Sequence, residues 1–217
     1  MIRFSKTAPM GLFALGTMLL AAGCGSGGTA ARLMNAMDGQ SSISMLVNNN
    51  TVANGTPFGA ASGYSPVSSG SEQVQIQAGG ITLFNSSLTL NSGNNTVLAT
   101  NFGVTVFADN KSTPSSGNIQ IRAINAANSM GTVDVYIVAP GTDVSTVNAT
   151  ASNVGFQSAS SYQTLAAGSY QVEFTQAGTK NVLLNSNALS FSAGQIRTVV
   201  SLDGSGVFTT AVLSDLN

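Results

Sequence analysis

The chain has 217 residues and a formal net charge of −1, with only 7% charged residues, no His, no Trp and one Cys. Without His or a second Cys, most catalytic triads and most zinc sites are excluded. The weak, slightly acidic charge leaves no basic footprint for nucleic acid, so no nucleic-acid partner is expected.

The first 23 residues resemble a bacterial lipoprotein signal peptide. Arg3 and Lys6 precede an apolar run over 8–22, which is shorter than the roughly 20 residues that span a bilayer. The run ends in residues 20–24, Leu-Ala-Ala-Gly-Cys, which resemble the lipobox at which such signals are cleaved. We therefore expect 1–23 to be a lipoprotein signal peptide and Cys24 to carry lipid. An ordinary cleaved signal and an uncleaved membrane helix remain alternatives.

Lipid on Cys24, with acyl chains such as palmitate, implies the membrane as a partner, because two or three chains anchor a protein durably. Gly25 follows the cysteine instead of aspartate. By resemblance to Gram-negative sorting signals, this predicts a cell-envelope protein anchored in the outer membrane. Residues 24–30 are rich in Gly, Ser and Thr and are expected to form a flexible tether.

The remaining chain contains an internal repeat, which predicts two domains. The first domain is expected over 31–110, the linker over 111–117 and the second domain over 118–217. Four pairs of segments match in the same order: 31–36 with 121–126, 58–64 with 156–162, 70–76 with 168–174, and 88–93 with 189–194. Insertions in turns explain the drifting offset, so a duplicated domain is the best interpretation.

Both halves show the alternation of strands and lack helical periodicity. In 170–175 the residues Tyr170, Val172 and Phe174 alternate with polar ones, and 133–137 alternates in the same way. Such a pattern predicts one face on a core and one face in water. Turn residues such as Asp203-Gly204 separate the runs. The fold class is therefore expected to be all-β: two tandem small β-sandwich domains, immunoglobulin-like or transthyretin-like.

Segments 133–143, 156–162 and 165–172 together resemble the bacterial family called domain of unknown function 4397 (DUF4397). Its members show a Val-Asp-Val-Tyr strand, a phenylalanine, a tyrosine and an Ala-Gly-x-Tyr turn. The resemblance covers most of 118–217 and is weaker over 31–110, where Ser44-Met45-Leu46-Val47 replaces that strand. It implies two copies of the domain in an exported or lipid-anchored protein, and it adds no mechanism.

Candidate catalytic residues are few. A Ser–Lys dyad would need Lys111 or Lys180, both in turn-like surroundings that favour solvated lysines. A glycosidase-like pair would need two carboxylates flanking a cleft. Asp134 and Glu173 are predicted on outward strand faces, and Asp143 is predicted to cap a turn. A structural role is the favoured interpretation for these three acids.

Binding residues are equally hard to single out. Calcium would need oxygen ligands such as Asp38, Asp109, Asp143 or Asp203, but no dense acidic loop is present. We expect no cofactor and no metal. Tyr64 and Tyr162 occupy equivalent positions of the repeat, which favours a shared packing role over the presentation of rings to a sugar.

These observations predict a lipid-anchored cell-envelope protein with a structural or binding role and no enzymatic activity. An adhesin module that binds carbohydrate or protein through its loops is the alternative, with an envelope protein or glycan as partner. It requires a concave patch with exposed aromatic side chains. A carboxylate-based hydrolase is the second alternative, and it requires two acids in one pocket.

Overall fold

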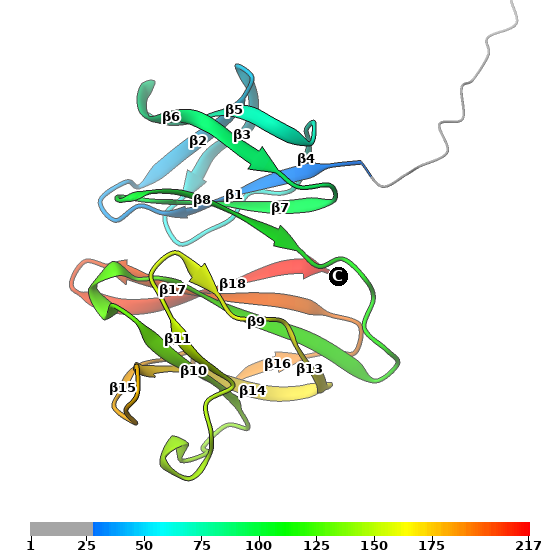
Figure 1. Ribbon diagram of the computed structural model, residues 1–217, viewed down its shortest axis with the longest axis vertical. Coiled ribbons are helices and arrows are strands. Elements are labelled where there is room, and N and C mark those ends of the chain that lie inside the picture. Colours follow the sequence, from blue (N-terminus) through cyan, green and yellow to red (C-terminus); the bar gives the residue numbers. More distant parts are fainter. Residues whose placement is uncertain (1–27) are drawn as a thin grey trace, which may run out of the picture.

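A computed structural model describes residues 28–217, which form two β-sandwiches and confirm the all-β prediction (Figure 1). Residues 1–27, including Cys24, lie outside the described residues. Within 28–217, no helix has the length and apolar character needed to cross a membrane. The strands of the first sandwich are β1 (Ala30–Ala36), β2 (Ser42–Val47), β3 (Asn50–Pro57), β4 (Ser65–Pro66), β5 (Gly70–Ala78), β6 (Ile81–Leu90), β7 (Asn94–Thr100) and β8 (Gly103–Asp109).

The second sandwich repeats this order with small changes and two short 3-10 turns. Its strands are β9 (Asn118–Ala126), β10 (Val133–Val138), β11 (Ala151–Val154), β12 (Ser158–Ala159), β13 (Gln163–Ala166), β14 (Gly168–Gln176), β15 (Val182–Asn185), β16 (Leu189–Phe191), β17 (Ile196–Gly204) and β18 (Val207–Leu216). The 3-10 turns are η1 (Asn128–Met130) and η2 (Val144–Thr146). Residues 110–117 connect the two sandwiches.

Each sandwich has an outer and an inner sheet, and the two inner sheets face each other in the middle of the molecule (Figure 1). The inner sheets have the orders β4-β1-β7-β8 and β12-β9-β17-β18, and the outer sheets β3-β2-β5-β6 and β11-β10-β14-β15. In each inner sheet the two central strands, β1 with β7 and β9 with β17, run parallel. In the second sandwich β13 also pairs with β9 and β16 with β14. The shared strand plan supports the duplication inferred from the sequence.

Alternating side chains build three apolar layers from these four sheets. Leu33, Met45 and Ile76 belong to the core of the first sandwich, and Ile121 and Phe174 to that of the second. The central strands of the inner sheets are buried on both faces, so their other face forms a third layer between the sandwiches. That layer contains Met34, Ala36, Leu98, Ile124, Ala126, Val200, Leu202, Ala211 and Leu213.

The prediction that Asp134 and Glu173 face water is wrong. Both residues are only 6% exposed, and Tyr136 between them in the sheet is 2% exposed. The segment between β10 and β11 returns over this face, where Lys180 lies 4.8 Å from the Tyr136 ring centre and donates to the carbonyl of Val147. The Asp134 carboxylate has a structural role, because its two oxygens accept the backbone N–H groups of Asn153 and Gly178 at 2.8 and 2.9 Å.

A buried polar network crosses the layer between the sandwiches. The Arg32 guanidinium of the first sandwich donates to the Asp215 carboxylate and, at 2.7 Å, to the carbonyl of Ser214, both in the second. Its Nε donates to Thr96 Oγ1 at 2.8 Å. Arg32 is 3% exposed and Asp215 is 4% exposed, so the pair is shielded from water. Such a pair depends on complete hydrogen bonding.

The equivalent arginine of the second sandwich makes the same contacts in the opposite direction. Arg122 donates to the Asp109 carboxylate and, at 2.9 Å, to the carbonyl of Ala108, both in the first sandwich. Its Nε donates to Thr198 Oγ1 at 2.8 Å. The interface is therefore isologous, like that of a symmetric dimer.

Tyr64 and Tyr162 complete the network, which confirms their shared packing role. The Tyr64 hydroxyl donates to Asp109 Oδ2 at 2.6 Å, and the Tyr162 hydroxyl donates to Asp215 Oδ2 at 2.8 Å. Each ring centre lies 4.6 Å from the guanidinium of the arginine in its own sandwich. Burial raises the pKa of both hydroxyls well above the ordinary tyrosine value. Both therefore stay protonated and act as donors.

We expect Arg32→Met to destabilise residues 28–217 by roughly 3–5 kcal/mol, because it leaves the buried Asp215 carboxylate without its cation. The free energy of unfolding in urea measures the effect. Lys111→Met, on an exposed lysine of the connecting segment, is the control and should change stability by less than about 0.5 kcal/mol. A loss below about 1 kcal/mol for Arg32→Met would contradict a stabilising role of the pair.

Candidate functional site: a groove between the sandwiches

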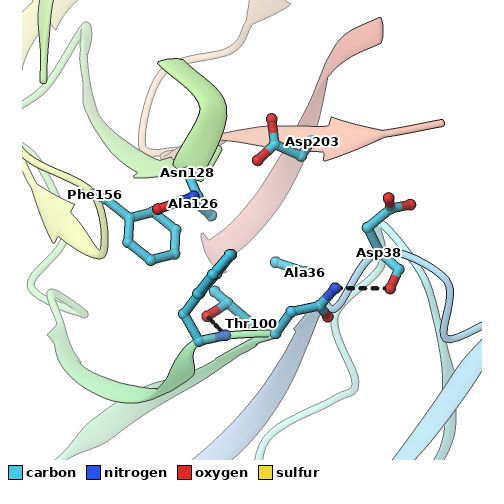
Figure 2. Close-up of a pocket in the computed structure, with 9 residues that line it drawn as sticks. Ala36, Asp38, Thr100, Ala126, Asn128, Phe156 and Asp203 are labelled. Carbon is cyan, nitrogen blue, oxygen red and sulfur yellow. Dashed lines mark hydrogen bonds between the residues drawn. The ribbon is translucent and has the colours of Figure 1, made fainter. Parts of the chain in front are cut away.

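A groove lies at one end of the layer between the sandwiches, where loops of both repeats meet (Figure 2). Three adjoining hollows with volumes of about 20, 190 and 230 Å³ share Asp38, and two of them share Asp203. Small-molecule sites typically occupy roughly 300–1,000 Å³ and favour domain interfaces. The groove lies at such an interface, and each of its three hollows is smaller than a typical ligand pocket.

Two buried asparagines hold the loops that carry the groove residues. Asn35 and Asn125 occupy equivalent positions in β1 and β9, and both are 0% exposed. The Asn35 amide donates to the carbonyl of Thr56 at 3.0 Å, and its Oδ1 accepts the N–H of Met37 at 3.0 Å. The Asn125 amide donates to the carbonyl of Gly131 at 2.8 Å. These bonds fix the turns that present Asp38 and Asn128.

The carboxylates of Asp38 and Asp203 lie on the side of the hollow away from the Phe156 ring (Figure 2). Asp38 Oδ1 accepts the N–H of Ser205 at 3.4 Å, a contact that joins the two repeats. Asp203 Oδ2 accepts the N–H of Ser129 at 3.0 Å. Each carboxylate thus keeps further acceptor capacity for a ligand.

Phe102 supplies an exposed aromatic surface beside the acids. Its side chain is 67% exposed, and its ring meets that of Phe156 edge-to-face with 5.7 Å between centroids. The backbone N–H of Phe102 donates to Thr100 Oγ1 at 3.2 Å, and the same oxygen accepts from the Gln157 amide at 2.6 Å. The short turn between β7 and β8 therefore displays the ring from a fixed base.

The groove is built from equivalent positions of the two repeats. Ala36 pairs with Thr100 in the first inner sheet, as Ala126 pairs with Leu202 in the second. It follows that Asp38 corresponds to Asn128, and that Asn101 corresponds to Asp203. Each repeat thus contributes one carboxylate and one amide, at crossed positions. The approximate twofold axis that relates the two sandwiches passes near the groove.

This arrangement combines two chemistries that together suit a sugar. An exposed aromatic ring offers an apolar face for C–H groups. The carboxylates accept hydrogen bonds from hydroxyls, and the amides of Asn101 and Asn128 donate and accept them. The adhesin alternative required a concave patch with exposed aromatic side chains, and the groove supplies one such side chain, that of Phe102.

The other acids singled out from the sequence lie elsewhere. Asp109 binds Arg122 in the interface. Asp143 caps η2, as predicted, by accepting the N–H of Ser145 at 2.8 Å, and its hydrogen bonds with Ser145 lower its pKa. Burial, with a smaller effect of Asp143, raises the pKa of Glu173. Asp134 and Glu173 do not line the groove, whereas Asp38 and Asp203 share two of its hollows, which is the arrangement that the hydrolase alternative requires.

Neither Lys111 nor Lys180 lines the groove. Lys180 contacts the Tyr136 ring and the Val147 carbonyl, and Lys111 is exposed. Across residues 28–217, no three acidic, Cys or His side chains gather into a cluster suited to a metal ion. Cys24 lies outside this part of the chain.

In the sequence, Asp38 and Asp203 stood out only as candidate oxygen ligands for calcium, and Phe102 did not stand out. The available signal was the repeat itself. An alignment of the sequences of β7 and β17 would have shown that Asn101 occupies the position equivalent to Asp203. The turn predicted at Asp203-Gly204 lies slightly later, at Ser205-Gly206, so Asp203 ends on a strand that points it into the groove.

A family model described as Domain of unknown function (DUF4397) matches residues 29–136 and 138–217. No curated protein matches the sequence. Among solved structures, the C-terminal domain of AlgF from P. aeruginosa is 8% identical, with a TM-score of 0.30 over 46% of this chain and 97% of that one. A family CBM26 module from Eubacterium rectale Amy13K, in complex with maltoheptaose, is 10% identical, with a TM-score of 0.29 over 85% and 95%. These scores are too low to support an argument.

We expect Phe102→Ala to reduce stability by less than about 1 kcal/mol, because two thirds of the side chain already contacts water. Phe174→Ala is the comparison, since that ring is 0% exposed and its loss should cost about 3–5 kcal/mol. Urea unfolding of both variants makes the measurement. Equal losses would show that Phe102 is a packing residue and would remove it from the candidate site.

Proposed function

We propose that this chain, which belongs to the DUF4397 family, is a lipid-tethered, non-enzymatic binding protein of the bacterial envelope. In this proposal, the protein holds a glycan in the groove between its two sandwiches. The groove itself carries the proposal. It presents the 67% exposed Phe102 ring beside Asp38 and Asp203, with amides of both repeats around them. The family description assigns no reaction, and the residues around the groove supply contacts for binding.

The rigid frame around the groove supports a binding role. The turns that line it are tied to the buried Asn35 and Asn125, and the two repeats are locked together by the Arg32 and Arg122 pairs. A site on a fixed frame loses little conformational entropy when a ligand binds. A preformed groove therefore suits recognition of a polymer whose individual contacts are weak.

A glycan array with residues 28–217, which contain every described strand, tests the proposal. We expect binding to at least one glycan class, with an affinity at least about tenfold lower for Phe102→Ala. Val182→Ala, on an apolar side chain of the outer sheet that is 42% exposed, is the matched control and should bind normally. No binding to any glycan, or equal binding by Phe102→Ala, would refute the groove as the site. Cleavage of a bound glycan would refute the non-enzymatic role.

The tether is proposed from the sequence, with lipid on Cys24 and anchorage in the outer membrane. In the bacterial host, Cys24→Ser should leave the protein in the soluble fraction and without lipid mass, because no other cysteine is present to carry the acyl chains. Fractionation and mass spectrometry of the full chain measure both effects. If the Cys24→Ser protein still sediments with membranes, another anchor holds it and the proposal fails.

A further inference from the structure

We infer that the glycan held by the groove carries free, positively charged amino groups, so that the ligand is a hexosamine chain and not a neutral one. The inference rests on the proposed function and names the ligand class of the same site. Its basis is a pair of carboxylates without cations beside an exposed aromatic ring.

The groove acids have no basic partner among residues 28–217. The ion pairs within 4.0 Å in this part of the chain involve Asp109 and Asp215. Arg32 and Arg122 are committed to those pairs, and Lys180 to the Tyr136 ring and the Val147 carbonyl. The charges of Asp38 and Asp203 are therefore left for a ligand to compensate.

A neutral ligand would bind here at a cost. A ligand that displaces water from these two carboxylates removes part of their solvation. A ligand ammonium group provides both hydrogen-bond donors and the missing charge. Charge-assisted hydrogen bonds of this kind are about twice as strong as neutral ones.

Phe102 adds the second contact that an amino sugar can use. A cation over an aromatic face within roughly 6 Å of its centroid is attracted by the ring electrons. The same ring packs against the C–H face of a sugar. Phe102 lines one hollow with both carboxylates, so a hexosamine lying over the mouth of this hollow would have the ring and an acid beneath it.

The crossed acids and amides fit a chain better than a single sugar. Asp38 and Asn128 are equivalent positions, as are Asn101 and Asp203, so each repeat presents one charged and one neutral polar group. Carboxylates would bind amino groups, and amides would bind hydroxyls. A chain lying across the two repeats would use both sets.

Calorimetric titration of residues 28–217 tests the inference with three oligosaccharides of equal length: glucosamine, N-acetylglucosamine and glucose oligomers. At about pH 6, where amines are protonated, we expect the glucosamine oligomer to bind at least about tenfold more tightly than the other two. Asp38→Asn and Asp203→Asn should each remove most of that preference, and added salt should weaken it. Asp143→Asn, on an exposed acid outside the groove, is the control and should leave it intact.

The outcomes separate the inference from the proposed function. Equal binding of the three oligomers, lost in Phe102→Ala, overturns the inference and leaves glycan binding in place. A lysine peptide of the same charge that binds as tightly as the glucosamine oligomer overturns the assignment to a sugar. If none of the oligomers binds and the glycan array is also negative, the proposed function fails. The Asn variants keep the size of Asp and one of its two acceptor oxygens, and their unfolding curves verify that the groove is folded.

Discussion

Two buried guanidinium–carboxylate pairs, Arg32 with Asp215 and Arg122 with Asp109, cross the same interface in opposite directions. Each sandwich supplies one cation and one anion to these pairs. If the sandwiches were separated, both charges would lose their partners. Complete hydrogen bonding makes the burial of four charges tolerable, and the geometry that completes it fixes one orientation of the repeats. The groove exists only in that orientation, because its walls belong to different repeats.

The interface resembles a symmetric dimer that has been joined into one chain. Matched positions carry matched roles in the arginines, the tyrosines and the threonines that bind the carboxylates. Away from the interface the repeats differ. The outer face of β10 and β14 is covered by the segment around η2, whereas the outer face of the first sandwich carries an exposed amide ladder that includes Gln73, Asn85 and Gln75. The equivalence of the two repeats is therefore most complete at the contact between them.

Local patterns in the sequence predicted the strands, because alternation in segments such as 170–175 reports directly on the pleat. They also placed Arg32 and Arg122 in matched motifs. The role of those arginines was hidden, since Arg32 meets a partner 183 residues away. Asp134 and Glu173 were misplaced because alternation distinguishes two faces of a strand and does not show what covers them. Phe102 was missed because an isolated Phe in a turn has no period to mark it.

The course of β1 links the groove to the end of the chain that is proposed to carry lipid. The strand begins at Ala30, six positions after Cys24, and its far end leads directly into the turn that carries Asp38. Seven residues of strand span about 20 Å. In a protein held through Cys24, this strand would therefore place the groove about its own length away from the point where the tether joins the fold.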